Sequence, residues 1–598
     1  MQPITYLFGK IRRYDPGMFG VMAANTLLSA LYPFIWVVVP AWILRFGAVW
    51  DKSTLILVIT GAGILAAGCG FAISFWTGNY RMRMNGVRYH LIRDLMAHSL
   101  RMPYQNTLDP QVLDDINFAN ETVSNPMRGA GGIILTLLRL FGGLLASLGF
   151  AGLIATLSPW FMLVMALLFA LTFALSHRAD RIETDSWEEY KGPERRWYQV
   201  STVARDAAYK KDILLYETSP LIIRYMQHFR AQMMAIMEGV SKKRLRLETW
   251  VCLLNLLRDI GLFAFIIHRF LAGSLDAGGF FLYSSGLAGF MTVAQAAMAD
   301  LSAIRREGER FAAYIRLVER KSEEESKATP HAPKREGALA LENISFRYPG
   351  ASEDTLKNIS LTLPPGHKLA LVGENGAGKS TLIKLICRLY RPTSGRITLG
   401  GVDIWDIPEG DYFSRLEVVF QDAMILPFSL KENVLMGAAW DEARYQQVMA
   451  LSGLDSIAAT LPRGDESTLM RVLDDEGIDL SGGQKQTLFL ARALYKNAGA
   501  MLILDEPTAA LDPRSEEEVF SQMLSITRGQ TALFISHRLS STRFADRILV
   551  MDGGNILQEG DHRQLMAQHS GLYRHMFLAQ AQQYQQAEDQ PSPRLSTG

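Results

Sequence analysis

The sequence predicts two unlike parts: an all-α membrane domain of six helices with long cytoplasmic extensions, and an α/β domain with a phosphate-binding loop. Three observations predict this architecture. Six apolar runs lie in the first half of the 598 residues, a Gly-rich loop follows a short apolar strand in the second half, and apolar strands there alternate with helical patterns. A chain of this length exceeds one ordinary core, so separate domains are expected.

Six apolar runs are candidates to cross a bilayer, which takes about 20 helical residues. They are Phe19–Phe46, Thr54–Trp76, Gly131–Leu157, Trp160–Leu175, Trp250–Leu271 and Gly278–Ala299. The fourth is the shortest and follows the third after Ser158 and Pro159. Buried helices of a large soluble domain are the alternative, but six such runs in one half of a chain favour a membrane domain.

Cationic residues predict the orientation of these helices. The segments 79–130 and 178–247 are rich in Arg and Lys, whereas the short links near Asp51, Ser158 and Asp276 hold few cations. Positive charge accumulates on the cytoplasmic side, so the amino terminus, both long segments and the second domain are expected inside the cell. Residues 1–14 lack the pattern of a signal peptide. A bacterial inner membrane or plasma membrane is the expected location.

Apolar residues at helical spacing within the inner segments, such as Val87, Leu91, Leu95 and Leu100, predict membrane helices that continue into the cytosol. Solvated helical hairpins are the alternative interpretation.

Composition shifts predict the domain boundaries: a membrane domain over 1–320, a linker over 321–337, an α/β domain over 338–586 and a disordered tail over 587–598. The linker reads KSEEESKATPHAPKREG, and its charges and prolines are typical of a segment outside a core.

Composition also limits the partners. Lys and Arg number 61 against 60 for Asp and Glu, which gives no support to a nucleic-acid partner. Cys69, Cys252 and Cys387 match no metal-ligand or redox spacing and are expected to be buried apolar residues.

Residues 373–380 read GENGAGKS, the pattern of a phosphate-binding loop, between an apolar strand and a helical segment. Backbone N–H groups of such a loop attract phosphate oxygens. Lys379 would supply charge for the β and γ phosphates of a nucleotide, and Ser380 a hydroxyl for Mg²⁺. A Gly-rich turn without function is the alternative. The candidate nucleotide-binding residues are Gly373, Asn375, Gly376, Gly378, Lys379, Ser380 and Thr381.

A second candidate element is the apolar strand that ends in Asp505 and Glu506. A carboxylate at a strand tip can hold Mg²⁺, and the next can polarise an attacking water as a general base. Phosphoryl transfer needs mainly positioning and charge neutralisation, which these groups supply. For this segment taken alone, the alternative is that Asp505 and Glu506 are two solvated acids at a strand end.

Residues 480–484 read LSGGQ, between the phosphate loop and Asp505. In this place the motif resembles the signature of the ABC (ATP-binding cassette) ATPases, which implies an α/β P-loop ATPase domain that binds ATP with Mg²⁺. In that family the signature caps the ATP held by the phosphate loop of a second copy. Ser481, Gly482, Gly483 and Gln484 would then form half of a shared site, so the chain is expected to pair.

The resemblance implies roles for four further residues. They are Tyr348, which matches the aromatic residue that stacks on adenine; Gln421, the glutamine that reaches Mg²⁺ and the attacking water; His537, the histidine at the γ phosphate; and Asp512, in the loop that crosses between paired ATPases. The predicted catalytic residues are then Glu506, His537 and Gln421, and the predicted metal ligands are Ser380, Gln421 and Asp505.

Three residues in two places depart from the family pattern. Asp475-Glu476-Gly477 stands where exporters commonly have Glu-Arg-Gly, and Thr487 stands where Arg is usual. All catalytic positions match, which modestly favours a homodimer, with a heterodimer as the alternative.

The first half is similar to the exporter-type (type IV) ABC membrane domain, in which each inner segment turns at a short coupling helix that touches an ATPase. The resemblance implies turns near residues 109–118 and 206–216. It implies the lipid bilayer and a second half-transporter subunit as partners.

Charged residues within the predicted spans suggest a substrate route, because charges are costly in lipid. Arg258 and Asp259 lie in the fifth span, with Arg139 in the third and His268 further along the fifth. Adjacent helix residues do not face each other, so Arg258 and Asp259 are each expected to need another partner or to line a water-filled path. The hypothesis is that at least one contacts the substrate route; interhelical pairing or snorkelling is the alternative.

The leading functional hypothesis is ATP-driven export of an amphiphilic small molecule, lipid or peptide by alternating access in a dimer. Import through the same fold, for example of a metal-siderophore, is the alternative. An ATP-gated channel or regulator is a further one. Six spans with one cassette disfavour a soluble ABC ATPase acting on ribosomes or DNA.

Overall fold

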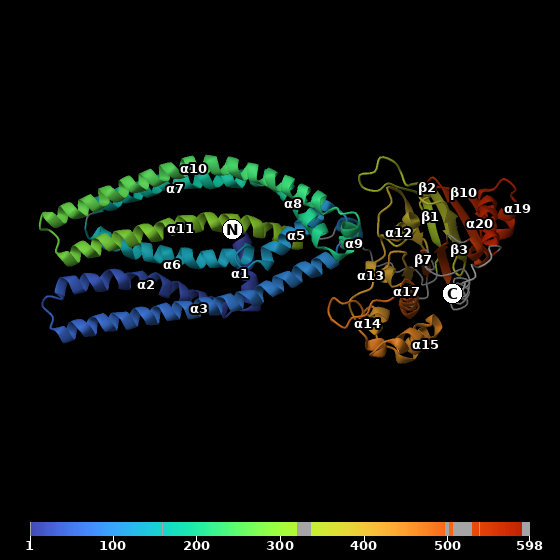
Figure 1. Cartoon of the computed structure of the whole chain (residues 1–598), viewed down its shortest axis with the longest axis horizontal. Coiled ribbons are helices and arrows are strands. Elements are labelled where there is room, and N and C mark those ends of the chain that lie inside the picture. The colour runs from blue at the N-terminus through green and yellow to red at the C-terminus, as the bar shows by residue number, and fades with distance from the viewer. Residues whose placement is uncertain are drawn as a thin grey trace, which may run out of the picture. The chain divides into compact units, whose positions relative to one another are not determined.

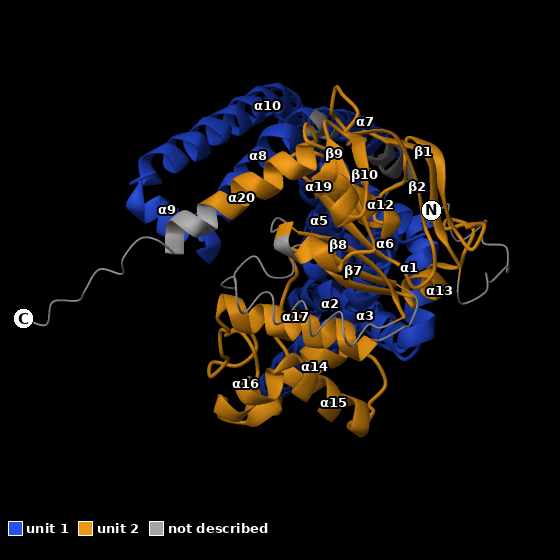
Figure 2. Cartoon of the chain, turned by 90° about the vertical axis from the view of Figure 1, so that its right-hand side faces the viewer, with its two compact units in different colours: residues 1–102, 106–320 blue, residues 103–105, 321–598 orange. Residues whose placement is uncertain are grey.

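The computed structural model describes residues 2–157, 159–319, 337–496, 501–505, 529–536 and 539–588 (Figure 1). The chain divides into two compact units, one of residues 1–102 and 106–320 and the other of residues 103–105 and 321–598 (Figure 2). The first unit is built of long helices, and the second combines strands with helices. The predicted fold class is confirmed.

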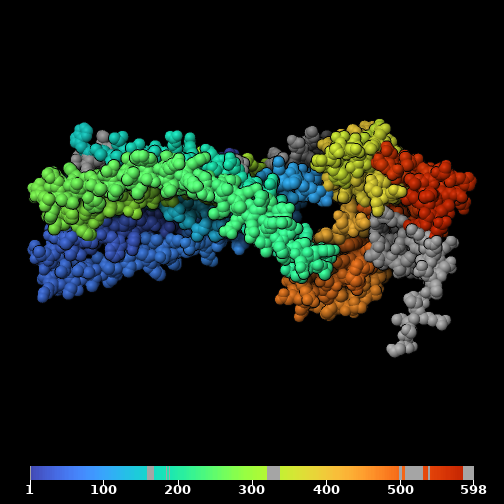
Figure 3. All heavy atoms as spheres, turned by 45° about the horizontal axis from the view of Figure 1, so that its top comes forward, coloured from blue at the N-terminus to red at the C-terminus, as the bar shows by residue number. Residues whose placement is uncertain are grey.

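Long helices packed along their lengths form the first unit. The helices from residue 2 to residue 318 are α1 (Gln2–Tyr14), α2 (Met18–Phe46), α3 (Lys52–Leu100), α4 (Tyr104–Thr107), α5 (Pro110–Ser124), α6 (Gly129–Ala155), α7 (Pro159–Asp185), α8 (Trp187–Arg205), α9 (Ala207–Leu215), α10 (Ser219–Leu271) and α11 (Ala277–Val318); the first two residues of α4 are assigned to the second unit. Helix α2 packs on α3, α6 on α11, and α7 on α10 (Figure 1). The space-filling view shows α10, in green, along one face of the unit (Figure 3).

Aspartate side chains begin three of these helices. Asp109 accepts a hydrogen bond from the Gln111 backbone N–H at the start of α5. Asp206 and Asp276 cap α9 and α11 in the same way. Each carboxylate satisfies one of the N–H groups that have no partner within their own helix.

The six predicted spans lie on α2, α3, α6, α7, α10 and α11. Within the described residues, five helical stretches are long and apolar enough to cross a membrane, beginning at Met18, Lys52, Pro110, Ser219 and Ala277. The fourth predicted span lies on α7, which has 27 residues. With 49, 53 and 42 residues, α3, α10 and α11 continue well beyond their apolar runs, as predicted.

One of the two predicted inner turns is misplaced. The chain leaves the long helices between Leu100 and Pro110, where α4 is the only helix, whereas the predicted turn at 109–118 lies mostly within α5. The physical reason is the Asp109 cap followed by Pro110, a pair that starts a helix. The second predicted turn, 206–216, coincides with the short helix α9.

The apolar stripe predicted on α3 is correct for three of its four residues. Val87, Leu91 and Leu95 are at most 1% exposed in a cluster with α1, α5, α6 and α11. Leu100 is 87% exposed, because α3 ends there and no described part of the chain covers its last turn.

Two sheets form the second unit. Its strands are β1 (Leu339–Phe346), β2 (Leu356–Leu363), β3 (Lys368–Gly373), β4 (Ser394–Leu399), β5 (Val402–Asp403), β6 (Leu416–Val419), β7 (Met501–Asp505), β8 (Thr531–Ile535), β9 (Arg547–Asp552) and β10 (Asn555–Gly560). The larger sheet has the order β10-β9-β3-β8-β7-β6 and is parallel except at β10. The smaller sheet, β2-β1-β4-β5, is antiparallel and was not predicted.

Helices complete this unit. They are α12 (Lys379–Ile386), α13 (Glu409–Phe413), α14 (Leu430–Leu435), α15 (Glu442–Ser452), α16 (Leu454–Thr460), α17 (Gly482–Lys496), α19 (His562–Ala567) and α20 (Leu572–Glu588). One core joins the parallel sheet to α14, α15, α16 and α17, and another joins it to α12 and the antiparallel sheet.

The cysteine prediction is correct only for Cys387, which is buried on the α12 side of the parallel sheet. Cys252 is exposed and Cys69 half-buried, because both lie on long helices whose outer faces no other described segment of the chain covers.

Candidate nucleotide-binding site

The phosphate loop has the strand–loop–helix context that the sequence predicts. It joins the buried strand β3 to α12, and Gly373, Gly376 and Gly378 all have positive φ angles. At Gly373 a Cβ atom would lie 2.1 Å from the carbonyl oxygen of Met551 on the neighbouring strand. Only glycine therefore allows the loop to leave the sheet at this point.

Lys379 holds the inside of this loop. Its Nζ donates to the carbonyl oxygens of Gly373 and Glu374 at 2.8 and 2.9 Å, and the residue is 6% exposed. The ammonium group is thus held over the first residues of the loop, on the first turn of α12. A positive charge combined with a helix amino terminus favours a phosphate group.

Ser380 and Asp505 bring two oxygen atoms together from distant parts of the chain. Ser380 Oγ donates to Asp505 Oδ1 at 3.3 Å, and Asp505, at the end of β7, is 4% exposed. A hydroxyl and a carboxylate beside a phosphate loop are ligands that suit Mg²⁺. These two predicted metal ligands therefore fit the ion.

Gln421 follows the edge strand β6 and is exposed. The parallel register pairs Val419 of β6 with Leu504 of β7. Gln421 therefore lies just beyond the level of Asp505, on the side of the sheet where the parallel strands have their carboxyl ends. Three other predicted residues lie outside the described residues: Glu506, Asp512 and His537.

Tyr348 is held against the start of α12. Its hydroxyl lies 3.1 Å from Thr381 Oγ1, and its ring packs edge-on against Phe346 and Tyr390 at 4.9 and 5.3 Å between centroids. This places the predicted adenine-stacking ring next to the phosphate-loop helix. The supporting role of Tyr390 was missed, since no local pattern connects it with Tyr348.

The signature segment forms the amino terminus of α17. Ser481 Oγ accepts from the Gln484 backbone N–H at 3.3 Å, and the Ser481 N–H donates to Gln484 Oε1 at 2.8 Å. This reciprocal pair is a capping box, which explains why a helix begins at Gly482. Ser481 and Gly482 are exposed, so this end of the helix is open to a ligand.

Around the residues that depart from the family pattern, the local contacts differ. Gly477 is required by packing, because a Cβ atom there would lie 2.0 Å from the Met470 carbonyl oxygen. Asp475 and Glu476 are exposed. Thr487 Oγ1 donates to Gly483 O at 3.2 Å, within its own helix.

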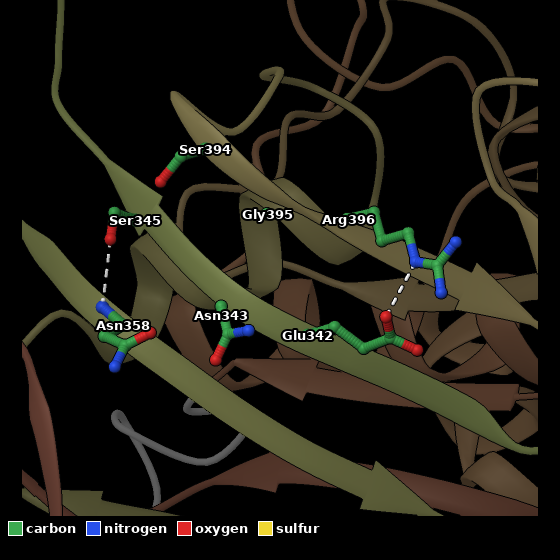
Figure 4. A pocket seen from close by; sticks show the side chains of 7 residues that line it. All are labelled: Glu342, Asn343, Ser345, Asn358, Ser394, Gly395 and Arg396. Carbon is green, nitrogen blue, oxygen red and sulfur yellow. Dashed lines mark hydrogen bonds and ion pairs between the residues drawn. The ribbon is translucent and has the colours of Figure 1, made fainter.

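A separate polar depression of about 580 Å³ lies on the antiparallel sheet (Figure 4). It is lined by Glu342, Asn343, Ser345, Asn358, Ser394, Gly395 and Arg396, none of which is a predicted site residue. Arg396 pairs with Glu342 at 2.7 Å across it. Ser345 Oγ also accepts from the Asn358 backbone N–H at 3.0 Å, and we assign this depression no ligand.

In the helical unit, the expectation that Arg258 and Asp259 do not pair is wrong. Arg258 Nε lies 2.9 Å from Asp259 Oδ1, because the long arginine side chain reaches around the helix. Arg139 pairs with Asp300 of α11 at 2.8 Å, which is the interhelical alternative. His268 is exposed.

Comparisons with known proteins agree with this geometry. Residues 356–509 match the family model of the ABC transporter. The chain is 27% identical over 521 residues to the subtilin transport ATP-binding protein SpaT of Bacillus subtilis, which covers 86% of this chain and 83% of that protein. It is 38% identical over 270 residues to the ATP-dependent lipid A-core flippase of Burkholderia pseudomallei (strain 1710b) and 36% over 312 residues to that of Bordetella avium (strain 197N). These two matches span about half of each flippase, 44% and 52%.

A solved structure of a bacterial Atm1-family ABC exporter with ATP bound has the same fold. The TM-score is 0.77 at 20% identity, over 96% of this chain and 98% of that one.

The fold and the site define an ATP-hydrolysing transporter whose membrane domain and nucleotide-binding domain share one chain. Residues 356–509 form an ABC transporter ATPase domain, and the chain as a whole is similar to exporter-type half-transporters in which this domain follows a membrane domain.

Proposed function

We propose that this chain is one half of a dimeric ATP-driven exporter of an amphiphilic small molecule, lipid or peptide. The observation that carries the proposal is the meeting of Lys379, Ser380 and Asp505 at one edge of the parallel sheet, joined to a unit of membrane-length helices. Export is supported by relatives named for subtilin transport and for flipping the lipid A core, and by the fold of an exporter. None of these observations favours import.

ATP binding follows from the residues of the phosphate loop. Loop N–H groups and Lys379 would hold the β and γ phosphates, and Tyr348 would stack on the adenine. Mg²⁺, held by Ser380 and Asp505 with Gln421 nearby, would neutralise charge on the phosphates. In this proposal Glu506 polarises the attacking water, His537 contacts the γ phosphate, and Asp512 lies where two cassettes meet.

Pairing of two chains is supported by the motifs and by one exposed surface. The chain has one phosphate loop and one signature segment, so two complete sites need two chains. The end of α9 exposes three large apolar residues, Leu214, Leu215 and Tyr216, at 63%, 76% and 76%. An apolar helix end of this kind is suited to contact with another subunit. A homodimer requires only this chain.

The proposed location is the bacterial inner or plasma membrane, with the amino terminus and the ATPase domain in the cytoplasm. The Arg- and Lys-rich extensions of the long helices support this orientation.

Transport into inside-out vesicles tests the proposal. Lys379→Ala and Glu506→Gln are expected to abolish both ATP hydrolysis and ATP-dependent accumulation of labelled amphiphiles. Lys384→Ala, one turn further along α12, is the matched control and should retain both. Conduction that persists in Glu506→Gln would instead indicate a gated channel. ATP-dependent release of a labelled amphiphile from loaded inside-out vesicles would indicate an importer.

A further inference from the structure

The guanidinium group of Arg258 is buried with most of its hydrogen-bonding capacity unused. Its side chain is 1% exposed, and Asp259 contacts Nε alone. Nη1 and Nη2 are buried and, within the described parts of the chain, have no hydrogen-bond partner. An unsatisfied buried donor costs about 1–3 kcal/mol, and more when it is charged. This cost indicates that another group meets these atoms during the working cycle.

A second unsatisfied atom lies one turn away on the same helix. Asn255 Oδ1 is buried and, among the described residues, also lacks a partner. Residues three apart on a helix are neighbours, so the two side chains form one polar patch on α10. If Asn255 rotated to accept from Arg258, it would engage one edge of a fork that has four terminal N–H groups. Acceptors from outside α10 would still be needed.

The patch faces the interior of the helical unit. Arg258, Leu262 and Ile266 lie on one stripe of α10 and are 3%, 4% and 1% exposed. The Arg258 guanidinium lies over the ring of Phe169 on α7, 5.6 Å from its centroid, and Phe169 packs against Phe290 on α11. Three helices therefore meet at the patch, and a movement of α7 against α10 would uncover it.

An apolar cluster continues the same stripe. Leu262 and Ile266 pack with Ile154, Leu157, Leu287 and Met291. A cationic fork next to apolar side chains matches a ligand with an anionic head and a hydrocarbon tail. The planar guanidinium binds carboxylate and phosphate oxygens in pairs.

We propose that Arg258, with Asn255, is the headgroup subsite of the transport route and binds the phosphate or carboxylate of an anionic amphiphile. Phe169 covers the subsite in the conformation described. The Asp259 carboxylate orients the guanidinium through Nε and reduces its net charge, which lets the anion leave again. This inference rests on the proposed transport function.

Equilibrium binding to the full-length protein in phosphatidylcholine nanodiscs tests the inference, with dodecyl phosphate, laurate and neutral dodecyl maltoside as probes. The readout is the ratio of the Kd for each anionic probe to the Kd for the neutral one, which cancels a general loss of binding. Arg258→Gln is expected to weaken this preference for the anion by about tenfold or more, and Arg258→Lys by less. Asp259→Asn is expected to strengthen it.

Opposite effects of the two substitutions distinguish binding from a structural role, which would change both variants in the same direction. Thermal unfolding of each variant checks that it is folded. An unchanged ratio in Arg258→Gln, or no preference for the anion in the wild type, would overturn the proposal. Competition by inorganic phosphate as effective as that of dodecyl phosphate would overturn the amphiphile assignment. ATP-dependent transport by the wild type, measured in parallel, tests the proposed function separately. A wild type that does not transport would contradict the proposed function, whatever the binding ratios are.

Discussion

Ser380 Oγ and Asp505 Oδ1 lie 3.3 Å apart although 125 residues separate them in the sequence. One side chain starts α12 after the phosphate loop, and the other ends β7 at the same edge of the parallel sheet. Parallel strands place their carboxyl ends together, so the sheet itself assembles the candidate metal site.

Metal dependence is the first prediction. Asp505→Asn and Ser380→Ala should each raise the Mg²⁺ concentration that gives half-maximal ATP hydrolysis, because each removes one oxygen ligand or weakens it. Titration of Mg²⁺ at saturating ATP measures the shift, and Ser414→Ala, at the residue that follows α13, is the control. An unchanged Mg²⁺ requirement in both variants would exclude these residues as ligands.

The second prediction concerns adenine binding by Tyr348. Tyr348→Ala should raise the KM for ATP about fivefold or more, since stacking on a base contributes about 1–3 kcal/mol. Tyr348→Phe keeps the ring and loses only the contact with Thr381, so its KM should change little. Steady-state ATPase kinetics distinguish the two, and equal effects would show that the hydroxyl, not the ring, is what matters.

Sharing of the ATP site between two chains is the third prediction. Lys379→Ala and Ser481→Arg should each inactivate a homodimer. A mixed dimer of these two variants, however, joins the intact phosphate loop of one chain to the intact signature of the other. Differently tagged chains purified in tandem should therefore recover ATP hydrolysis above either parent. If each site lay within one chain, every site in the mixed dimer would remain defective.

The fourth prediction concerns the ion pair between Lys10 and Asp94, which fastens α1 to the carboxyl-terminal part of α3 at 2.8 Å. Burial alone would raise the pKa of Asp94, but hydrogen bonds from Lys10 and Arg93 lower it below its ordinary value of 3.8. A lowered carboxyl pKa stabilises the folded state above pH 3.8, and this contribution is lost as the pH falls through the folded pKa. Asp94→Asn should lower the Tm by about 1–2 °C at pH 7.

The thermal shift caused by Asp94→Asn should shrink as the solution is acidified below pH 3.8. Exposed Asp115 of α5 provides a matched control, and Asp115→Asn should leave the Tm unchanged at every pH. A shift of equal size at all pH values would contradict the role of the ion pair.

Glu194 of α8 gives the fifth prediction, with the opposite sign. Burial raises its pKa above the ordinary value of 4.5, the Glu121 carboxylate raises it further, and Arg128 and Arg310 oppose this. Its stabilising contribution is complete below pH 4.5 and is lost as the pH rises through the folded pKa.

Glu194→Gln should therefore raise the Tm at pH 7.5, and the gain should disappear towards pH 4.5. Thermal unfolding across this range measures it, with Glu189→Gln on the exposed side of α8 as the control. A lower Tm at pH 7.5 would show that the ionised carboxylate is needed for packing.

Local patterns made much of this protein predictable. The spacing of GENGAGKS between a strand and a helix predicts the conformation of the phosphate loop. Glycine has no Cβ atom, so the glycines at 373, 376 and 378 can adopt positive φ angles without contacts from distant segments. Ser481 and Gln484 lie within one turn of each other, so their reciprocal cap also follows from sequence. The apolar runs predicted the membrane helices for the same reason, since length and composition decide whether a helix suits a bilayer.

Contacts between distant segments could not be predicted in this way. The ring of Tyr390 behind Tyr348, the pairing of Arg139 with Asp300 and the start of α5 at Asp109 depend on packing or on a cap that competes with helical periodicity. Helical spacing also failed for Arg258, because it describes where side chains leave the backbone and not how far a long one reaches.

The sequence by itself determined the class of protein, the chemistry of its phosphate loop and the positions of its apolar helices, because these depend on residues close together in the chain. Only the tertiary structure decided that Ser380 meets Asp505 and that the terminal nitrogens of Arg258 are buried without an acceptor in the described chain. Both depend on which helices and strands become neighbours, and that is set by the packing of surfaces far apart in sequence.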